Sequence, residues 1–280
     1  MAAKVCLITG ATSGLGLATA QALAQRGATV VVVGRNSEKS ADVVRRLQQL
    51  TGNPSVCALQ ADLSSQGDIR RLAEAFKLQH RRLDVLINNV GVLELSRRVS
   101  TDGIEMTFAV NHLSYFLLTH LLLDMLIASA PSRIINVSSV AHQGAEMDFD
   151  DLQGQRKYGG IRSYGQSKLA NLLFTYALAT RLEGTGVTVN ALHPGLVATN
   201  LFRGYGPFGA LVKFFSRMRG ISPAVGARTI VYLATSPEVE GVTGHYFSQQ
   251  RAIPSSQASH DVAAAKRLWA VSDALTGLSA

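Results

Sequence analysis

The sequence predicts a doubly wound α/β fold, in which helices cover both faces of a largely parallel sheet. Two observations lead to this fold class. Short β-branched runs alternate along the chain with longer helical patterns, as expected of repeated β-α-β units. The runs are also apolar throughout, which is typical of strands buried on both faces. The expected strands span residues 5–9, 30–33, 56–59, 85–88, 134–137 and 187–192.

The helices between these strands are expected to begin near Leu15, Ser37, Gln66, Asp102 and Ser163. Residues 196–220 differ in texture, because they are rich in Gly, Phe and Leu. Ser222-Pro223-Ala224 is then typical of a helix start, with serine as the cap and proline in the first turn. A last strand is expected over 245–247 and a last helix over 261–275.

No linker, compositional break or internal repeat divides the chain. We therefore predict a single domain over residues 1–280, with a C-terminal tail from about residue 248 onward.

The composition indicates a globular protein with an anionic ligand. Of its 280 residues 47% are hydrophobic and 16% charged, and 27 Lys and Arg against 19 Asp and Glu give a net charge of +8. The basic pairs are scattered along the chain, and no zinc finger, RNA-recognition motif or continuous basic region occurs. We therefore expect no nucleic-acid partner, and a membrane surface is the other alternative explanation for the charge.

Cys6 and Cys57 lie in strand-like runs, as small buried residues do, which favours a reducing compartment. The chain passes from residues 1–4 directly into a strand, which leaves no room for a signal or transit peptide, and no apolar run reaches bilayer-spanning length. We expect a soluble, cytoplasmic protein without a membrane span.

No metal is expected, because no His-x-x-x-His or Cys-x-x-Cys arrangement accompanies the histidines. His142 lies three residues after Ser139, and His193 directly precedes Pro194. Either histidine could border a pocket, but satisfied structural histidines are more common, so neither enters the predicted catalytic set.

Tyr164 and Lys168 lie four positions apart in a predicted helix and therefore on one face of it. A free phenol has a pKa of about 10 and keeps its proton at neutral pH, whereas a neighbouring cation favours the phenolate. Such a pair can transfer a proton. The same spacing also occurs by chance on solvated helix faces, so the pair gains meaning only from the rest of the sequence.

A glycine-rich segment, residues 9–16, joins the first strand to the first helix. Glycine permits close backbone approach, and the free N–H groups and positive dipole end of a helix attract phosphate. No Lys-Ser/Thr follows, so the segment is not a P-loop, and a turn that needs glycine only for packing is the structural alternative. We predict that this turn binds the pyrophosphate of a dinucleotide through Gly10, Thr12, Ser13, Leu15 and Gly16.

The end of the second strand is where such a fold distinguishes nicotinamide cofactors at the adenosine ribose. Instead of the acidic residue that would select NAD, the chain has Gly34-Arg35-Asn36 followed by Lys39. The planar donors of Arg35 suit a 2′-phosphate. We predict NADP(H) over NAD(H), and the alternative is an arginine that only caps or solvates the loop.

The glycines follow a Thr-Gly-x-x-x-Gly-x-Gly spacing, and with it the chain resembles the short-chain dehydrogenase/reductase family almost from end to end. The motifs that carry the resemblance are Asp62-Leu63, Asn88-Asn89-Val90-Gly91, Asn111, Ser138-Ser139, Tyr164 with Lys168, and Pro194-Gly195. Val90 departs from the family, which usually has alanine there. The resemblance implies a Rossmann-type fold and a cofactor site that also includes Asp62, Leu63, Asn89, Gly91, Tyr164, Lys168, Pro194, Gly195, Val197 and Thr199.

The resemblance also implies the catalytic roles. Ser139 would hold the substrate oxygen and Tyr164 would transfer the proton. Lys168 would bind the nicotinamide ribose and lower the pKa of the phenol, and Asn111 would steady a water chain leading from Lys168 to solvent. The family's catalytic serine is usually the second of a pair, so we choose Ser139 over Ser138, which can satisfy local backbone groups. For Asn111 the alternative is a helix-internal asparagine that bonds the backbone.

Within the family the chain is most similar to the retinol dehydrogenase and protochlorophyllide reductase branch, through residues 137–142, 167–171, 193–195 and 244–269. The resemblance implies that residues 196–220 form a substrate lid, whose apolar side chains favour a lipophilic alcohol, aldehyde or ketone. They could instead pack on the sheet, on another subunit or on a membrane surface. A homodimer or homotetramer would be usual for the family.

The leading hypothesis is an NADP(H)-dependent oxidoreductase that interconverts a carbonyl and an alcohol on a lipophilic small molecule. The alternative is a non-catalytic protein that senses the dinucleotide with the same fold. Such a sensor would not need Ser139, Tyr164 and Lys168 together, which favours the enzyme.

Overall fold

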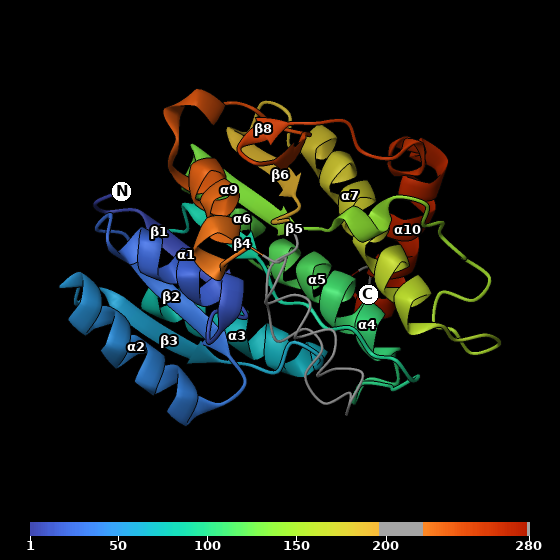
Figure 1. Ribbon diagram of the computed structural model, residues 1–280, viewed down its shortest axis with the longest axis horizontal. Coiled ribbons are helices and arrows are strands. Elements are labelled where there is room, and N and C mark those ends of the chain that lie inside the picture. Colours follow the sequence, from blue (N-terminus) through green and yellow to red (C-terminus); the bar gives the residue numbers. More distant parts are fainter. Residues whose placement is uncertain (196–220, 279–280) are drawn as a thin grey trace.

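The computed structural model describes residues 1–195 and 221–278, so the predicted lid, with Val197 and Thr199, lies outside the described residues. The described residues form an eight-stranded sheet with the order β3-β2-β1-β4-β5-β6-β7-β8 (Figure 1). Every pair of neighbours is parallel except β7 and β8. The strands are β1 (Val5–Thr9), β2 (Thr29–Gly34), β3 (Val56–Gln60), β4 (Val85–Asn88), β5 (Ser132–Val137), β6 (Val187–Leu192), β7 (Tyr246–Ser248) and β8 (Arg251–Ala252).

Helices cover both faces of this sheet, as the predicted fold class requires. Side chains that alternate along a strand point to opposite faces, and the two apolar cores divide β1 and β2 in this way. One core joins the sheet to α3 (Gln66–Gln79), α5 (Ser114–Leu121) and α7 (Gly160–Arg181). The other joins it to α1 (Gly14–Ala24), α2 (Ser37–Thr51) and α9 (Pro223–Thr235).

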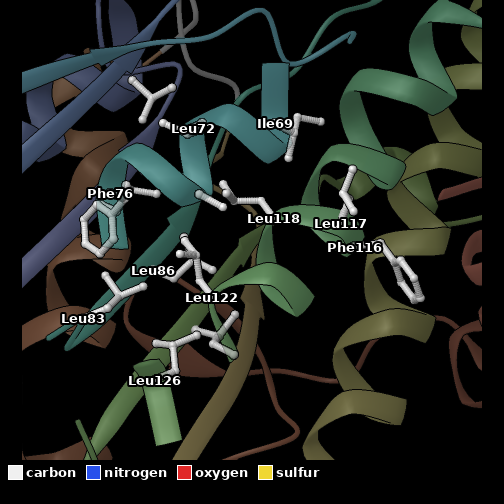
Figure 2. Close-up of a cluster of buried hydrophobic side chains, with 14 of the residues drawn as sticks. Ile69, Leu72, Phe76, Leu83, Leu86, Phe116, Leu117, Leu118, Leu122 and Leu126 are labelled. Carbon is white, nitrogen blue, oxygen red and sulfur yellow. The ribbon is translucent and has the colours of Figure 1, made fainter. Parts of the chain in front are cut away.

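The core beneath α3 and α5 is built from large aliphatic and aromatic side chains. Phe76 on α3 and Leu86 on β4 are fully buried, as is Leu118 on α5. Figure 2 shows these side chains together with others from the same elements and from the chain leading to β5. Burial of each such side chain contributes about 1.5–3 kcal/mol, so this layer helps to hold α3 and α5 against the sheet.

Most of the predicted elements are confirmed, including all six strands before residue 193. The helix expected near Asp102 is wrong, because Gly103 has a φ of +74° and residues 100–104 form a tight turn. The Asp102 carboxylate instead accepts the Gln66 N–H at the start of α3, at 2.9 Å. The helical region begins later, with α4 (Met106–Phe108), capped by the buried Glu105 carboxylate. It continues through the π-helical turn η1 (Ala109–Leu113), α5 and α6 (Leu123–Ala128).

The C-terminal tail contributes β8 to the edge of the sheet and a helix that packs beside α7. Its helix α10 (Val262–Thr276), which Asp261 caps, lies close to the predicted bounds and alongside α7 (Figure 1). Trp269 packs edge-on against Phe116 at a centroid distance of 5.2 Å, and the Arg181 guanidinium lies 3.7 Å from the centre of its ring. Strand β8 was not predicted. Among the described helices, none combines the length and hydrophobicity needed to cross a bilayer.

Candidate active site

The carboxyl ends of β1, β4 and β5 meet in the middle of the sheet, where the strand order changes direction. The chain runs outward from β1 to β3 on one side and from β4 to β8 on the other. In open parallel sheets, the crevice at such a point is where ligands bind. Thr9, Asn88 and Val137 end these three strands, and the predicted turn and motifs follow them directly.

The turn between β1 and α1 has backbone conformations that favour glycine. Gly10 and Gly14 have φ values of +66° and +55°, which L side chains rarely adopt. At Gly16 space is decisive, because a Cβ atom would lie 2.6 Å from both the Gly10 oxygen and Asn89 Nδ2. The N-cap residue Ser13 makes no side-chain capping bond, whereas the caps of α2, α3, α9 and α10 all do.

Asn89 ties this turn to the end of β4. Its side-chain nitrogen donates to the Thr9 carbonyl at 2.7 Å, and its backbone N–H donates to Thr9 Oγ1 at 2.8 Å. Thr9 Oγ1 also accepts the Val90 N–H at 3.1 Å. Valine at position 90, where the family usually has alanine, therefore leaves intact the hydrogen bonds that join β1 to β4. These bonds fix the turn relative to the rest of the site.

The ends of β2 and β3 form the adenosine side of the predicted cofactor site. Thr12 packs over Gly34 so closely that a Cβ there would clash. Arg35 follows Gly34 with an exposed side chain, and among the described residues no carboxylate pairs with it. Asp62 accepts the N–H and the hydroxyl of Ser64, at 3.0 and 2.8 Å, and the neighbouring Leu63 is buried.

The two serines after β5 have different surroundings. Ser138 is buried, and its hydroxyl donates to the Lys168 carbonyl oxygen at 2.8 Å. Ser139 is half-buried and accepts the Ala141 N–H at 3.2 Å, and its hydroxyl lies close enough to the Tyr164 phenol to lower its pKa. The Ser138 hydroxyl is thus used in a hydrogen bond to the backbone, and Ser139 is the serine that faces the phenol.

Lys168 is almost fully buried on the first half of α7. Its Nζ donates to the Val137 carbonyl at 3.0 Å and lies 5.6 Å from the centre of the Tyr164 ring. Burial lowers the pKa of Lys168 to about 7. Burial also raises the pKa of Tyr164, and the nearby Ser139 hydroxyl opposes that rise. We expected the pKa of the phenol to be lowered. It is raised instead, because desolvation has a larger effect on it than the neighbouring polar groups.

Asn111 lies in the π-helical turn η1 and is completely buried. Its Oδ1 accepts the Val92 N–H at 2.8 Å, and its Nδ2 donates to the Val92 oxygen and to Ser167 Oγ, both at 2.9 Å. The backbone-bonding alternative thus describes much of what its side chain does. Gly91 lies beside it, and a Cβ there would be 3.6 Å from Lys168 Nζ. Asn111 and Lys168 therefore border the same small space.

Tyr115 was missed by the sequence prediction. Its ring is buried 5.8 Å from Lys168 Nζ, and its hydroxyl donates to the Val90 oxygen at 2.7 Å. The signal was present, because Tyr115 follows Asn111 by four residues and so shares its helix face. Tyr115 walls the site next to the lysine.

The segment after β6 completes the described site. Gly195 has a φ of +84°, its N–H donates to His193 Nδ1 at 3.1 Å, and Pro194 is half-buried. Val197 and Thr199 lie beyond the described residues. The structure thus brings Asn111, Ser139, Tyr164 and Lys168 together, and it places Arg35 and Asp62 just after the ends of β2 and β3. Among the described residues, no group of three or more His, Cys, Asp or Glu side chains is placed to hold a metal ion.

Fold and site together define a dinucleotide-dependent oxidoreductase, with a glycine-rich turn and a Ser-Tyr-Lys group at the switch point of a parallel sheet. Residues 4–207 match the family model for short chain dehydrogenases. The chain belongs to the short-chain dehydrogenase/reductase family. It is therefore an oxidoreductase that acts on CH–OH and C=O groups with a nicotinamide dinucleotide.

Several retinol dehydrogenases are similar over nearly the whole chain, which confirms the predicted branch. Retinol dehydrogenase 13 of Homo sapiens is 44% identical over 285 residues, which cover 99% of this chain and 86% of that protein. Retinol dehydrogenase 12 of Mus musculus is 42% identical over 275 residues, which cover 98% and 87%.

Solved structures confirm the fold. An uncharacterized protein from Mycobacterium paratuberculosis superposes with a TM-score of 0.79 at 31% identity, over 99% of this chain and 94% of that one. The Pseudomonas aeruginosa RhlG/NADP active-site complex has a TM-score of 0.71 at 30% identity, over 88% and 94%.

Proposed function

We propose that the protein is an NADP(H)-dependent oxidoreductase that interconverts a carbonyl and an alcohol on a lipophilic small molecule, with reduction as the favoured direction. The observation that carries this proposal is the contact of Ser139 with Tyr164 beside the buried Lys168, next to the glycine-rich turn. A dinucleotide-sensing protein has no use for that arrangement.

The described residues fit a nicotinamide dinucleotide. The uncapped start of α1 leaves backbone N–H groups for a pyrophosphate. The missing side chain at Gly91 leaves space beside Lys168 and Asn111, where the nicotinamide ribose would lie. When bound, the cofactor supplies or accepts the hydride. The residues proposed to hold it are Gly10, Thr12, Ser13, Leu15, Gly16, Arg35, Asp62, Leu63, Asn89, Gly91, Tyr164, Lys168, Pro194, Gly195, Val197 and Thr199.

The proposed preference for NADP(H) depends on Arg35. Its guanidinium is exposed, unpaired with any carboxylate among the described residues, and positioned directly after β2. A similar structure is that of a complex with NADP. Exposed Lys39 lies in the first turn of α2, where it adds positive charge near the same loop. A dianionic 2′-phosphate would therefore be favoured over a free ribose hydroxyl.

In the direction of reduction, Ser139 donates a hydrogen bond to the substrate carbonyl oxygen, and Tyr164 gives its proton to that oxygen as the carbon accepts hydride. The raised pKa of Tyr164 keeps the phenol protonated at neutral pH, as a proton donor must be. Lys168 and Asn111, which border one space, restore the proton to the phenolate through water. Each turnover thus consumes one proton from solvent.

A lipophilic substrate is proposed from the similarity to retinol dehydrogenases. Exposed apolar side chains also lie next to the reacting groups along the chain: Val140 follows Ser139, and Ile161 lies one turn before Tyr164 on α7. Residues 196–220 are proposed to complete the substrate site as a lid, in one domain with the rest of the chain. A bulky alcohol, aldehyde or ketone would suit these surroundings better than a sugar.

Two measurements test the proposal. NADPH oxidation is followed against aldehydes, ketones and quinones of graded size, and we expect turnover that increases with apolar character. Tyr164→Phe should then lower kcat by about 10²–10⁴-fold, since it removes the acid, while NADPH binding stays within about twofold. Substantial activity in the Tyr164→Phe enzyme, or no turnover of any carbonyl by the wild type, would refute the proposal.

A further inference from the structure

His142, at the end of the short helix η2 (Val140–His142), is completely buried and bonded at both ring nitrogens. Its Nδ1 lies 2.6 Å from the Ser139 carbonyl oxygen, and its Nε2 lies 3.2 Å from the Ser256 backbone nitrogen. A carbonyl can only accept and an N–H can only donate. The partners therefore fix a neutral ring, with the proton on Nδ1 directed at Ser139 and Nε2 accepting from Ser256.

The environment of the ring supports this neutral form. Tyr246 on β7 packs edge-on at 5.0 Å, and His193 packs on the same tyrosine at 5.9 Å. Burial lowers the pKa of His142, and it also lowers the pKa of His193. Apolar packing alone would not require an imidazole at this position. Because its two polar bonds are directional, the buried ring instead holds one backbone segment in a fixed place relative to another.

The segment on the far side of His142 is itself anchored to α7. Ser255 Oγ bonds the Tyr176 hydroxyl at 2.7 Å and Ser259 Oγ at 2.7 Å. His260 stacks on the Tyr176 ring at 4.9 Å with an interplanar angle of 9°. Tyr176 belongs to the same helix as Tyr164 and Lys168. The tail therefore connects α7, through His142, to the carbonyl of Ser139.

We infer that His142 is a positioning residue, which uses its two ring nitrogens to hold Ser139 against the C-terminal tail and so at the right place relative to Tyr164. This inference rests on the proposed function. The Ser139 hydroxyl side of the turn is fixed by the Ala141 N–H, and His142 fixes the carbonyl side. Displacement of a catalytic group by about 1 Å can cost about 10²-fold in rate.

Substitutions can separate the two bonds of the ring. His142→Asn places an amide nitrogen where Nδ1 is, so it keeps a donor for Ser139 and loses the acceptor for Ser256. His142→Leu loses both. We expect kcat to fall about 10²-fold in the leucine enzyme and to recover to within about tenfold in the asparagine enzyme. KM for NADPH should stay within about twofold in both, because the glycine turn is untouched. His245→Asn is the control, since His245 also bonds a backbone carbonyl but is exposed.

The tail is tested without altering the histidine. Ser256 has a φ of −63°, which proline also adopts, so Ser256→Pro removes the N–H at little backbone cost. Ser256→Ala keeps the N–H and removes only the hydroxyl, which makes no hydrogen bond among the described residues. We expect a fall in kcat of about tenfold for proline and no change for alanine. Thermal melting of each variant reports whether it is folded.

The outcomes distinguish this inference from the proposed function. If wild-type enzyme reduces carbonyls and Tyr164→Phe does not, the proposed function stands. In that case, wild-type kcat in folded His142→Leu or Ser256→Pro enzyme would overturn the role of His142 alone. Equal loss of kcat in His142→Asn and His142→Leu would also overturn it, since the donor to Ser139 would then be irrelevant.

Discussion

The site has two parts that are built in different ways. The proposed cofactor end is the glycine-rich turn with Arg35, and the reacting end is the group of Asn111, Ser139, Tyr164 and Lys168. The glycine-rich turn takes its positive φ values from its own glycines, and its close contacts come from within the turn and from Asn89 and Val90 at the end of the adjacent strand β4. The reacting end collects Asn111 from a π-helical turn, Ser139 from the end of β5 and Lys168 from α7, and it depends on bonds to the tail. The first end therefore depends on two adjacent strand ends, whereas the second also responds to packing of the C-terminal tail.

Filling the glycine turn should have the largest effect on the cofactor end. In Gly16→Val the new Cβ would meet Asn89 Nδ2 and the Gly10 oxygen, so the turn must open. We expect NADPH binding to weaken at least about 100-fold, measured as the dissociation constant by quenching of protein or cofactor fluorescence.

The matched control is Gly67→Ala in the first turn of α3. A Cβ there would meet only Arg71 Nη1, the end of a flexible side chain, at 3.5 Å, and Ser65 Oγ, at 3.8 Å. Its dissociation constant for NADPH should equal that of the wild type. Tight NADPH binding by Gly16→Val would mean that the turn is not the phosphate site.

At the reacting end, the buried ammonium of Lys168 should lower stability while serving catalysis. Its pKa falls from 10.5 to about 7 on burial. Between pH 7 and 10.5 the unfolded chain therefore binds more protons than the folded one, and the contribution of Lys168 makes stability rise with pH. We expect the Tm of the wild type to rise from pH 7 to 9 relative to that of Lys168→Met, and kcat of the variant to fall about 10²-fold or more.

Circular dichroism melts of the wild type and Lys168→Met at pH 7 and pH 9 measure this difference. The other titrating groups are the same in both proteins, so their effects on Tm cancel in the comparison. Parallel dependence of the two Tm values on pH would show that Lys168 is not desolvated. Unchanged kcat in Lys168→Met would remove the lysine from the reaction.

A smaller effect is expected on the outer side of the cofactor site. Arg35 is exposed, so its bond to a 2′-phosphate is formed in the presence of water. Arg35→Ala should weaken NADPH binding by about tenfold and leave NADH binding unchanged. The ratio of the two dissociation constants is the measurement. Arg26→Ala serves as the control, since exposed Arg26 follows α1 at the end far from the turn. An unchanged ratio in Arg35→Ala would favour a loop-solvating arginine.

The sequence predicted the fold and the glycine-rich turn between β1 and α1 well, because each is marked by local pattern. Apolar runs such as that of β2 and cap residues such as Asn36 act within a few positions. The helix near Asp102 failed because an aspartate resembles a cap, yet its carboxylate serves α3, 36 residues away. His142 was noticed beside Ser139, but its bond to Ser256 spans 114 residues. No spacing within the sequence reveals such a contact.

The direction of the Tyr164 pKa could not be predicted for a related reason. The helical spacing places an ammonium near the phenol, but the balance between charge and desolvation depends on burial by the whole fold. Because burial affects both groups, it raises the pKa of the phenol and lowers that of the lysine.

The smallest effect should come from the tail helix, which supports the π-helical turn that carries Asn111. Ser272 on α10 bonds Nε2 of buried His112, the residue after Asn111, at 2.8 Å, and both side chains are completely buried. Ser272→Ala leaves that nitrogen unpaired, which costs about 1 kcal/mol and should lower Tm by about 2–4 °C. Val262→Ala, exposed at the start of the same helix, should leave Tm unchanged. If Ser272→Ala also lowers kcat severalfold while NADPH binding is unaffected, the reacting end depends on a helix 160 residues away, as its construction implies. Wild-type Tm and kcat in that variant would instead mean that the reacting end does not depend on the tail helix.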